Sequence, residues 1–68
     1  MELKKRVGQK IKELRIMSGL NQTEYAKIFG KKRGTLADIE AGRCNVGINV
    51  VVEIALHHNV TTDEILMR

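Results

Sequence analysis

The chain has 68 residues, no proline, no tryptophan, one cysteine and a formal net charge of +4 at pH 7. This length leaves room for one small domain, expected over residues 1–68, and a hydrophobic share of 43% can supply its core. No run approaches the roughly 18 apolar residues of a membrane helix. Met1 leads directly into charged residues instead of a signal peptide, so we expect a cytoplasmic protein without a membrane partner.

The residues that usually carry catalysis or bind metals form no recognisable site. Cys44 is the only cysteine, which excludes a disulfide within the chain, and it lies far from His57 and His58, so no metal-ligand spacing results. No Ser-His-Asp, Cys-His or paired-carboxylate pattern is present either. We therefore expect neither an enzyme nor a cofactor.

The charge is divided unevenly along the chain. Residues 1–43 hold eleven Lys or Arg against five Asp or Glu, a net of +6. Residues 44–68 hold one against three, a net of −2. A basic half of this kind is typical of a surface that binds a polyanion.

Hydrophobic spacing predicts five short helices. Val7, Ile11 and Leu14 recur at i, i+4 and i+7, which favours an amphipathic helix over residues 3–18, stopped by Gly19. Asn21 and Glu24 have the spacing of a capping box for a second helix, which ends at Gly30.

A third helix is predicted from about Lys32 to Ala41, with Leu36 and Ile39 facing inward and Gly42 ending it. Residues 48–58 contain three consecutive valines, which favour a strand by propensity. A lone strand would have no partner, however, so we interpret the segment as a helix with Asn59 as its left-handed stop.

Thr61 and Glu64 then form a second capping-box pattern, which predicts a last helix through Met67. Five helices and no sheet indicate a compact all-α domain.

The second and third helices, at about residues 21–42, have the length and glycine-containing turn of a helix-turn-helix unit, whose second helix enters the DNA major groove. Lys31, Lys32 and Arg33 crowd the start of that helix. Cations there oppose the helix dipole by about 0.3 to 1 kcal/mol each. A bound phosphate would remove the conflict.

Across residues 5–66 the chain resembles the phage repressor and Cro type of helix-turn-helix domain, also called the xenobiotic-response-element family. That resemblance implies a five-helix, lambda-repressor-like fold. The residues that carry it are Val7, Gly8, Ile11, Leu14, Arg15, Leu20, Asn21, Gln22, Glu24, Ala26, Gly30, Thr35, Ile39, Glu40, Gly42, and Val60 through Glu64.

The resemblance also implies roles for individual residues. An ion pair between Arg15 and Glu40 would tie the first helix to the third. Residues facing base edges would be Lys32, Arg33, Gly34 and Asp38. Residues contacting phosphate would be Gln22, Thr23, Lys31, Thr35, Arg43 and Asn45.

Several of these roles have alternatives. Thr35 contacts either phosphate or a thymine methyl group, and Arg43 either contacts the DNA backbone or is a solvated loop cation. Arg33 either donates bidentately to guanine, worth about 1 to 3 kcal/mol of discrimination, or clamps a phosphate. Asp38 either accepts from cytosine or serves to exclude other sequences or orient Arg33. Gly34 either permits close approach to DNA or is an unselected surface residue.

Three positions depart from the family pattern. Val46 replaces a frequent proline, which leaves the entry to the fourth helix looser. Lys32 replaces the usual Ser or Thr cap, and His58 replaces a usual core leucine, which we interpret as a satisfied, partly buried side chain or an interface residue.

The function that follows is a sequence-specific transcriptional regulator, expected to be a repressor that binds a palindromic DNA operator as a homodimer. The surface expected to form the dimer is apolar and lies toward the C-terminus: Ile48, Leu56, Ile65, Leu66 and Met67. The alternative is an antitoxin or anti-repressor that uses the same fold to bind a protein partner.

Overall fold

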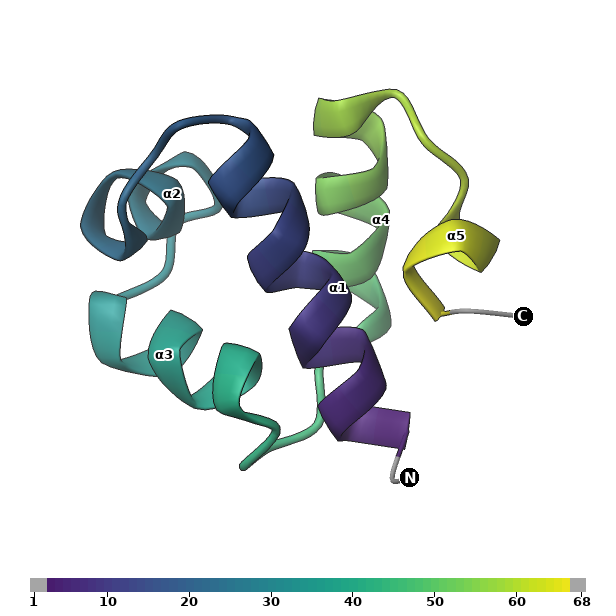
Figure 1. Cartoon of the computed structure of the whole chain (residues 1–68), viewed down its shortest axis with the longest axis horizontal. Helices are drawn as coiled ribbons and strands as arrows, with labels where there is room; N and C mark the ends of the chain where they lie inside the picture. The colour runs from purple at the N-terminus through teal and green to yellow at the C-terminus, as the bar shows by residue number, and fades with distance from the viewer. Residues whose placement is uncertain (1–2, 67–68) are drawn as a thin grey trace.

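The computed structural model describes residues 3–66, and within that range it contains five α-helices and no strand, which confirms the all-α prediction (Figure 1). The helices are α1 (Leu3–Met17), α2 (Gln22–Ile28), α3 (Arg33–Ala41), α4 (Ile48–His58) and α5 (Thr62–Leu66). In Figure 1, α1 runs through the middle of the molecule, with α2 and α3 on one side and α4 and α5 on the other.

The helix caps predicted from the sequence are present at Asn21, Asn59 and Thr61. The Asn21 side chain accepts from the backbone N–H of Glu24 at 2.8 Å, and the Glu24 carboxylate accepts from the N–H of Asn21 at 3.1 Å. Asn59 ends α4 in the left-handed conformation, with φ of 55°. The Thr61 hydroxyl accepts from the N–H of Glu64 at 3.2 Å and so caps α5. Each of these interactions lies within four residues of chain.

The valine-rich segment is helical despite its strand propensity. Val51, Ile54 and Ala55 lie on one side of α4 and are buried against the rest of the core. Burial of this stripe outweighs the modest cost of β-branched residues in a helix. The helical interpretation of residues 48–58 is thus confirmed.

The core draws on all five helices. Tyr25 of α2, Ile11 of α1 and Ile65 of α5 are completely buried, and partly buried side chains such as Phe29 pack around them. The complete buried hydrophobic set within residues 3–66 is Val7, Ile11, Leu14, Tyr25, Ala26, Leu36, Ile39, Val51, Ile54, Ala55 and Ile65.

Helices α1 and α3 lie very close together at Gly8. A Cβ atom placed on this residue would lie 2.1 Å from the carbonyl oxygen of Ile39, a distance at which the backbone of α3 would have to move. Glycine therefore permits the two helices to meet backbone to backbone. This contact fixes where along α1 the helix α3 packs.

Part of the predicted dimer surface belongs to the core instead. Ile65 has an exposed fraction of 0%, because α5 folds back and inserts this side chain between the other helices. Leu66 is half-buried against the same core, and Met67 lies outside the described residues. Assigning Ile65 to an exposed surface was wrong.

The histidine that replaces a core leucine is satisfied by a buried tyrosine, as expected. Nε2 of His58 lies 2.6 Å from the hydroxyl of Tyr25. Burial lowers the pKa of His58, and the neighbouring charge of His57 lowers it further. Burial together with the carboxylate of Glu40 raises the pKa of Tyr25 to about 12, against the opposing effect of Arg15. Both side chains are therefore neutral near pH 7, and they share one hydrogen bond whose direction is set by the tautomer of His58.

Candidate nucleic-acid interface

Helices α2 and α3 are joined by a four-residue turn, residues 29–32, which sets their crossing. Gly30 has φ of 66°, a left-handed conformation that favours glycine, and the N–H of Lys31 donates to the carbonyl of Ala26 at 2.9 Å. The turn thus reverses the chain within a few residues. This is the helix-turn-helix arrangement that the sequence predicted.

The start of α3 is basic and uncapped. Lys32 occupies the N-cap position with no side-chain hydrogen bond to the helix, so α3 begins at Arg33, one residue later than predicted. Lys31, Lys32 and Arg33 are all exposed. Unsatisfied backbone N–H groups, the positive end of the helix dipole and three cations therefore coincide, which is the chemistry of an anion site.

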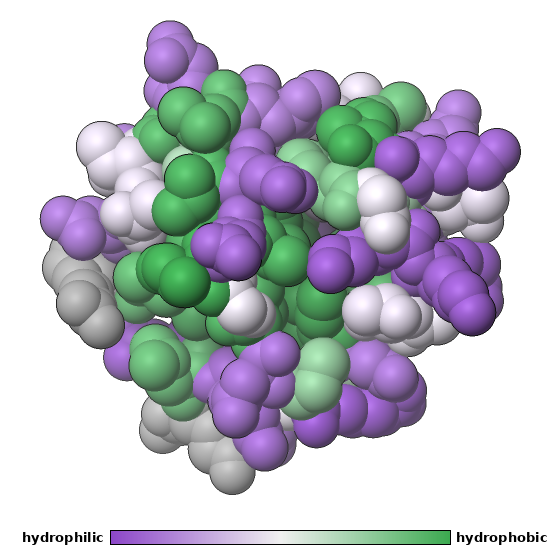
Figure 2. All heavy atoms as spheres, turned by 180° about the vertical axis from the view of Figure 1, so that it is seen from behind, coloured by the Kyte–Doolittle hydropathy of each residue, from purple (hydrophilic) through white to green (hydrophobic). Residues whose placement is uncertain are grey.

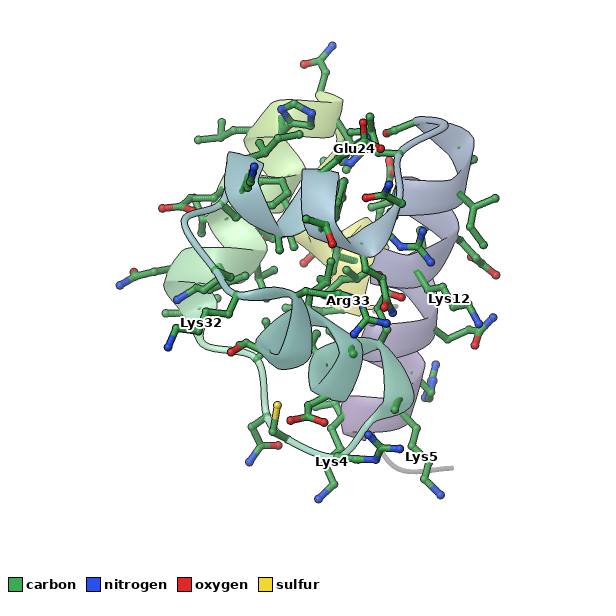
Figure 3. All side chains as sticks on the ribbon, turned by 90° about the vertical axis from the view of Figure 1, so that its left-hand side faces the viewer. Lys4, Lys5, Lys12, Glu24, Lys32 and Arg33 are labelled. Atoms are coloured by element: carbon green, nitrogen blue, oxygen red, sulfur yellow. The ribbon has the colours of Figure 1, made fainter. Side chains whose placement is uncertain are left out.

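The outward face of α3 consists of Gly34, Asp38 and Ala41. These exposed residues recur at i, i+4 and i+7, opposite the buried Leu36 and Ile39. Figure 3 looks toward α2 and α3 and shows Lys32 and Arg33 at the near end of α3.

Ala41 was not among the predicted site residues. Its seven-residue spacing from Gly34 is the sequence signal that could have identified it.

A buried carboxylate at the centre of the helix-turn-helix unit joins three helices. Nε of Arg15 donates to Oε2 of Glu40 at 2.7 Å, which confirms the ion pair between α1 and α3. A second guanidinium nitrogen, Nη1, donates to the carbonyl of Leu20 at 2.9 Å. Gln22, the first residue of α2, donates through Nε2 to Oε1 of Glu40 at 3.1 Å. Within residues 3–66 no buried side-chain nitrogen or oxygen lacks a hydrogen-bond partner.

The helix-turn-helix family model HTH_3 matches residues 11–65, most of the chain. The chain belongs to the helix-turn-helix family. It is accordingly a DNA-binding transcriptional regulator, with double-stranded DNA as its partner.

A solved structure of another protein has a similar fold. The helix-turn-helix chain is similar to the restriction-modification controller protein C.AhdI from Aeromonas hydrophila, with a TM-score of 0.79 and 27% sequence identity. The match covers 91% of this chain and 90% of that chain. No curated protein matches the sequence.

In this helix-turn-helix protein the predicted phosphate-contacting residues differ in their surroundings. Thr23, Lys31 and Thr35 are exposed. Gln22 is half-buried and bonded to Glu40, a contact across 18 residues that no sequence pattern predicted. Asn45 is exposed and borders a cavity of about 220 Å³ that Val46 and Leu3 also line.

Asp38 is paired differently from the expectation that it orients Arg33. Its carboxylate accepts from Nη1 of Arg43 at 3.1 Å, which joins the outward face of α3 to the following loop. Both side chains are well exposed, so this pair contributes only about 0 to 1 kcal/mol to stability. Arg43 is thus held beside the helix face by an interaction weak enough to be exchanged for one with a phosphate.

Two further cations adjoin this face of the protein. Lys5 and Lys12 of α1 are exposed, and Figure 3 shows them beside the helix-turn-helix unit, in the same view as Lys32 and Arg33. Neither lysine was among the predicted site residues. Their seven-residue spacing was the available signal that they share one face.

Between residues 3 and 66, no three His, Cys, Asp or Glu side chains lie close enough together to hold a metal ion. No helix in the same range combines the length and the hydropathy needed to cross a bilayer.

Proposed function

We propose that this protein is a repressor that inserts α3 into the major groove of a palindromic operator. The observation that carries the proposal is the coincidence of an uncapped, basic N-terminus with an outward face of small or short side chains on the same helix. The first attracts the phosphate backbone, and the second lets the helix approach base edges closely.

The roles proposed for individual side chains follow from their positions. Arg33 and Asp38, with Lys32 and Gly34, read base edges. The phosphate contacts come from Gln22, Thr23, Lys31, Thr35, Arg43 and Asn45. Phosphate contacts set the register of the helix on the DNA and carry no sequence information directly.

We further propose that the protein binds as a homodimer through α4. Ile48, Val52 and Leu56 recur every four residues and form an exposed apolar stripe, with exposed fractions of 62%, 39% and 76%. Figure 2, which views the molecule from behind, shows hydrophobic atoms over the middle of this side. Two such stripes packed together would bury all six side chains, the outcome expected of an exposed apolar patch.

Dimerisation would account for operator symmetry and length. In a dimer the two copies of α3, the recognition helices, would lie about 34 to 36 Å from each other. This distance is one turn of the duplex, so both helices would reach the same side of the DNA. A dimer bound to an operator that overlaps a promoter would block access of RNA polymerase, and we propose repression on this ground.

The similarity to C.AhdI suggests which genes this protein regulates. That protein is named as a restriction-modification controller, and the match extends over most of both chains. We propose control of restriction-modification genes as this candidate role. It is tested by asking whether the selected operator sequence occurs in the promoter of methyltransferase or endonuclease genes in the source genome.

The DNA-binding proposal is tested by selection and titration. Duplexes recovered from a random pool should share a two-fold symmetric site and bind far more tightly than unselected duplexes at the same salt concentration. Transcription in vitro from a promoter containing that site should fall on addition of protein. Absence of any duplex bound above the random background would contradict the function, and increased transcription would contradict repression alone.

A further inference from the structure

We propose that Lys5 and Lys12 of α1 form a second phosphate-binding row, separate from the helix-turn-helix unit, that contacts DNA phosphates bordering the groove occupied by α3. The inference rests on the proposed mode of DNA binding. It extends the DNA contact surface to the first helix, whose lysines the family resemblance did not single out.

The first argument is the position of the two lysines around α1. They are seven residues apart, so they lie within about 20° of each other around the helix axis. Gly8, which touches the backbone of α3, is about 40° to 60° from them on the same scale. The lysines therefore stand immediately beside the line along which α1 meets α3, and Figure 3 shows both at the edge of this face.

The second argument is that the stem of Lys5 is held against the end of α3. A Cβ placed on Gly42, the left-handed C-cap of α3, would lie 2.6 Å from Cγ of Lys5. Lys5 thus packs closely against this glycine, so its side chain starts next to the C-terminal end of α3. Lys5 as a whole is exposed, so its charged end reaches solvent beyond this contact.

The third argument is electrostatic. Within residues 3–66 the ion pairs are Arg15 with Glu40 and Arg43 with Asp38, and neither involves a lysine of α1. Cations gathered on one face without carboxylate partners repel one another, and a polyanion lying across them removes that repulsion. With Lys32 and Arg33 at the other end of α3, the recognition helix is flanked by positive charge at both of its ends.

The test compares lysines on opposite sides of one helix. Lys5→Gln and Lys12→Gln remove charge from the proposed row. Lys10→Gln makes the same change about 160° away from Lys12 around α1 and is the matched control. Affinity is measured for the selected operator and for a random duplex at several salt concentrations, with thermal melting to check folding.

Each row variant should lower the slope of log affinity against log salt by about 0.9 for each bound protomer and weaken operator and random duplex by the same factor. Lys12→Arg should restore the wild-type slope. Lys10→Gln should leave it unchanged.

The proposal is overturned if the row variants keep the wild-type slope, or if Lys10→Gln lowers it equally. Binding of the wild-type protein to the operator distinguishes failure of this proposal from failure of the proposed function. If the wild type shows no sequence preference, the function itself fails, whereas a specific wild type with unaffected variants overturns only the row. Should Lys5→Gln melt early, Lys12→Gln with its Arg rescue decides the question.

Discussion

Nε2 of Gln22 donates to Oε1 of Glu40 at 3.1 Å, so the first residue of α2 is fastened to a buried carboxylate on α3. The same carboxylate pairs with Arg15 of α1. One amide hydrogen of Gln22 is used in this bond, and the second remains for another acceptor. The residue proposed to contact phosphate is therefore already oriented by the network that holds the two helices together.

The buried and the exposed ion pairs should differ sharply in their contribution to stability. Arg15→Ala leaves the carboxylate of Glu40 buried without its cation, and we expect a loss of about 3 kcal/mol in the free energy of unfolding. Arg43→Ala breaks an exposed pair and should cost less than about 1 kcal/mol. Urea denaturation of both variants measures the difference. Equal losses would contradict the central role given to Glu40.

Arg33 and Gln22 should affect DNA binding in different ways. Arg33→Ala should abolish preference at one base pair of the operator, with a loss of about 1 to 3 kcal/mol of discrimination there. Gln22→Ala should weaken operator and random duplexes alike, because a phosphate contact carries no sequence information. Affinities for an operator series with single base changes test both variants. The reverse pattern would exchange the two assignments and make Arg33 the phosphate clamp.

Gly34 should show opposite effects on stability and on binding. It has an ordinary negative φ, and a Cβ atom added there would meet no atom within 4 Å. Gly34→Ala should therefore stabilise the free protein by up to about 1 kcal/mol. The added methyl group would stand on the outward face of α3 and should weaken operator binding if the backbone approaches DNA closely. Higher stability with unchanged affinity would identify Gly34 as an unselected surface residue.

Stability should fall in mildly acidic solution because of His58. Burial holds the pKa of this residue below 6.5, so the unfolded chain binds the proton more readily than the folded one. The stabilisation from the neutral ring is complete above about pH 6.5 and is lost as the pH falls through the lowered pKa. Denaturant titrations between pH 7 and pH 5 should show this decline.

The variant His58→Gln provides the comparison, since it keeps an acceptor for Tyr25 and does not titrate. Its stability should change less over the same pH range. His57→Gln removes the second cause of the lowered pKa and should give a smaller decline than the wild type. Parallel curves for wild type and His58→Gln would assign the acid sensitivity to other groups.

The sequence alone determined the features that depend on neighbours within a few residues. The Asn21 capping box and the left-handed stop at Asn59 follow from side-chain chemistry acting over four residues or less, and hydrophobic spacing located the five helical segments. The ion pair of Arg15 with Glu40 was also foreseen, but only through family resemblance, since 25 residues separate the two side chains.

Tertiary structure decided everything that depends on which surfaces meet. Only the folding back of α5 shows that Ile65 is core, and only the packing of α1 on α3 sets Lys5 beside Gly42. The pairing of Asp38 with Arg43 and of Gln22 with Glu40 was likewise invisible in the pattern of residues. The spacing of hydrophobic residues in the sequence predicts which side of a helix is apolar. The neighbour that covers that side, and the polar groups brought together at its edges, depend on how the helices pack in space.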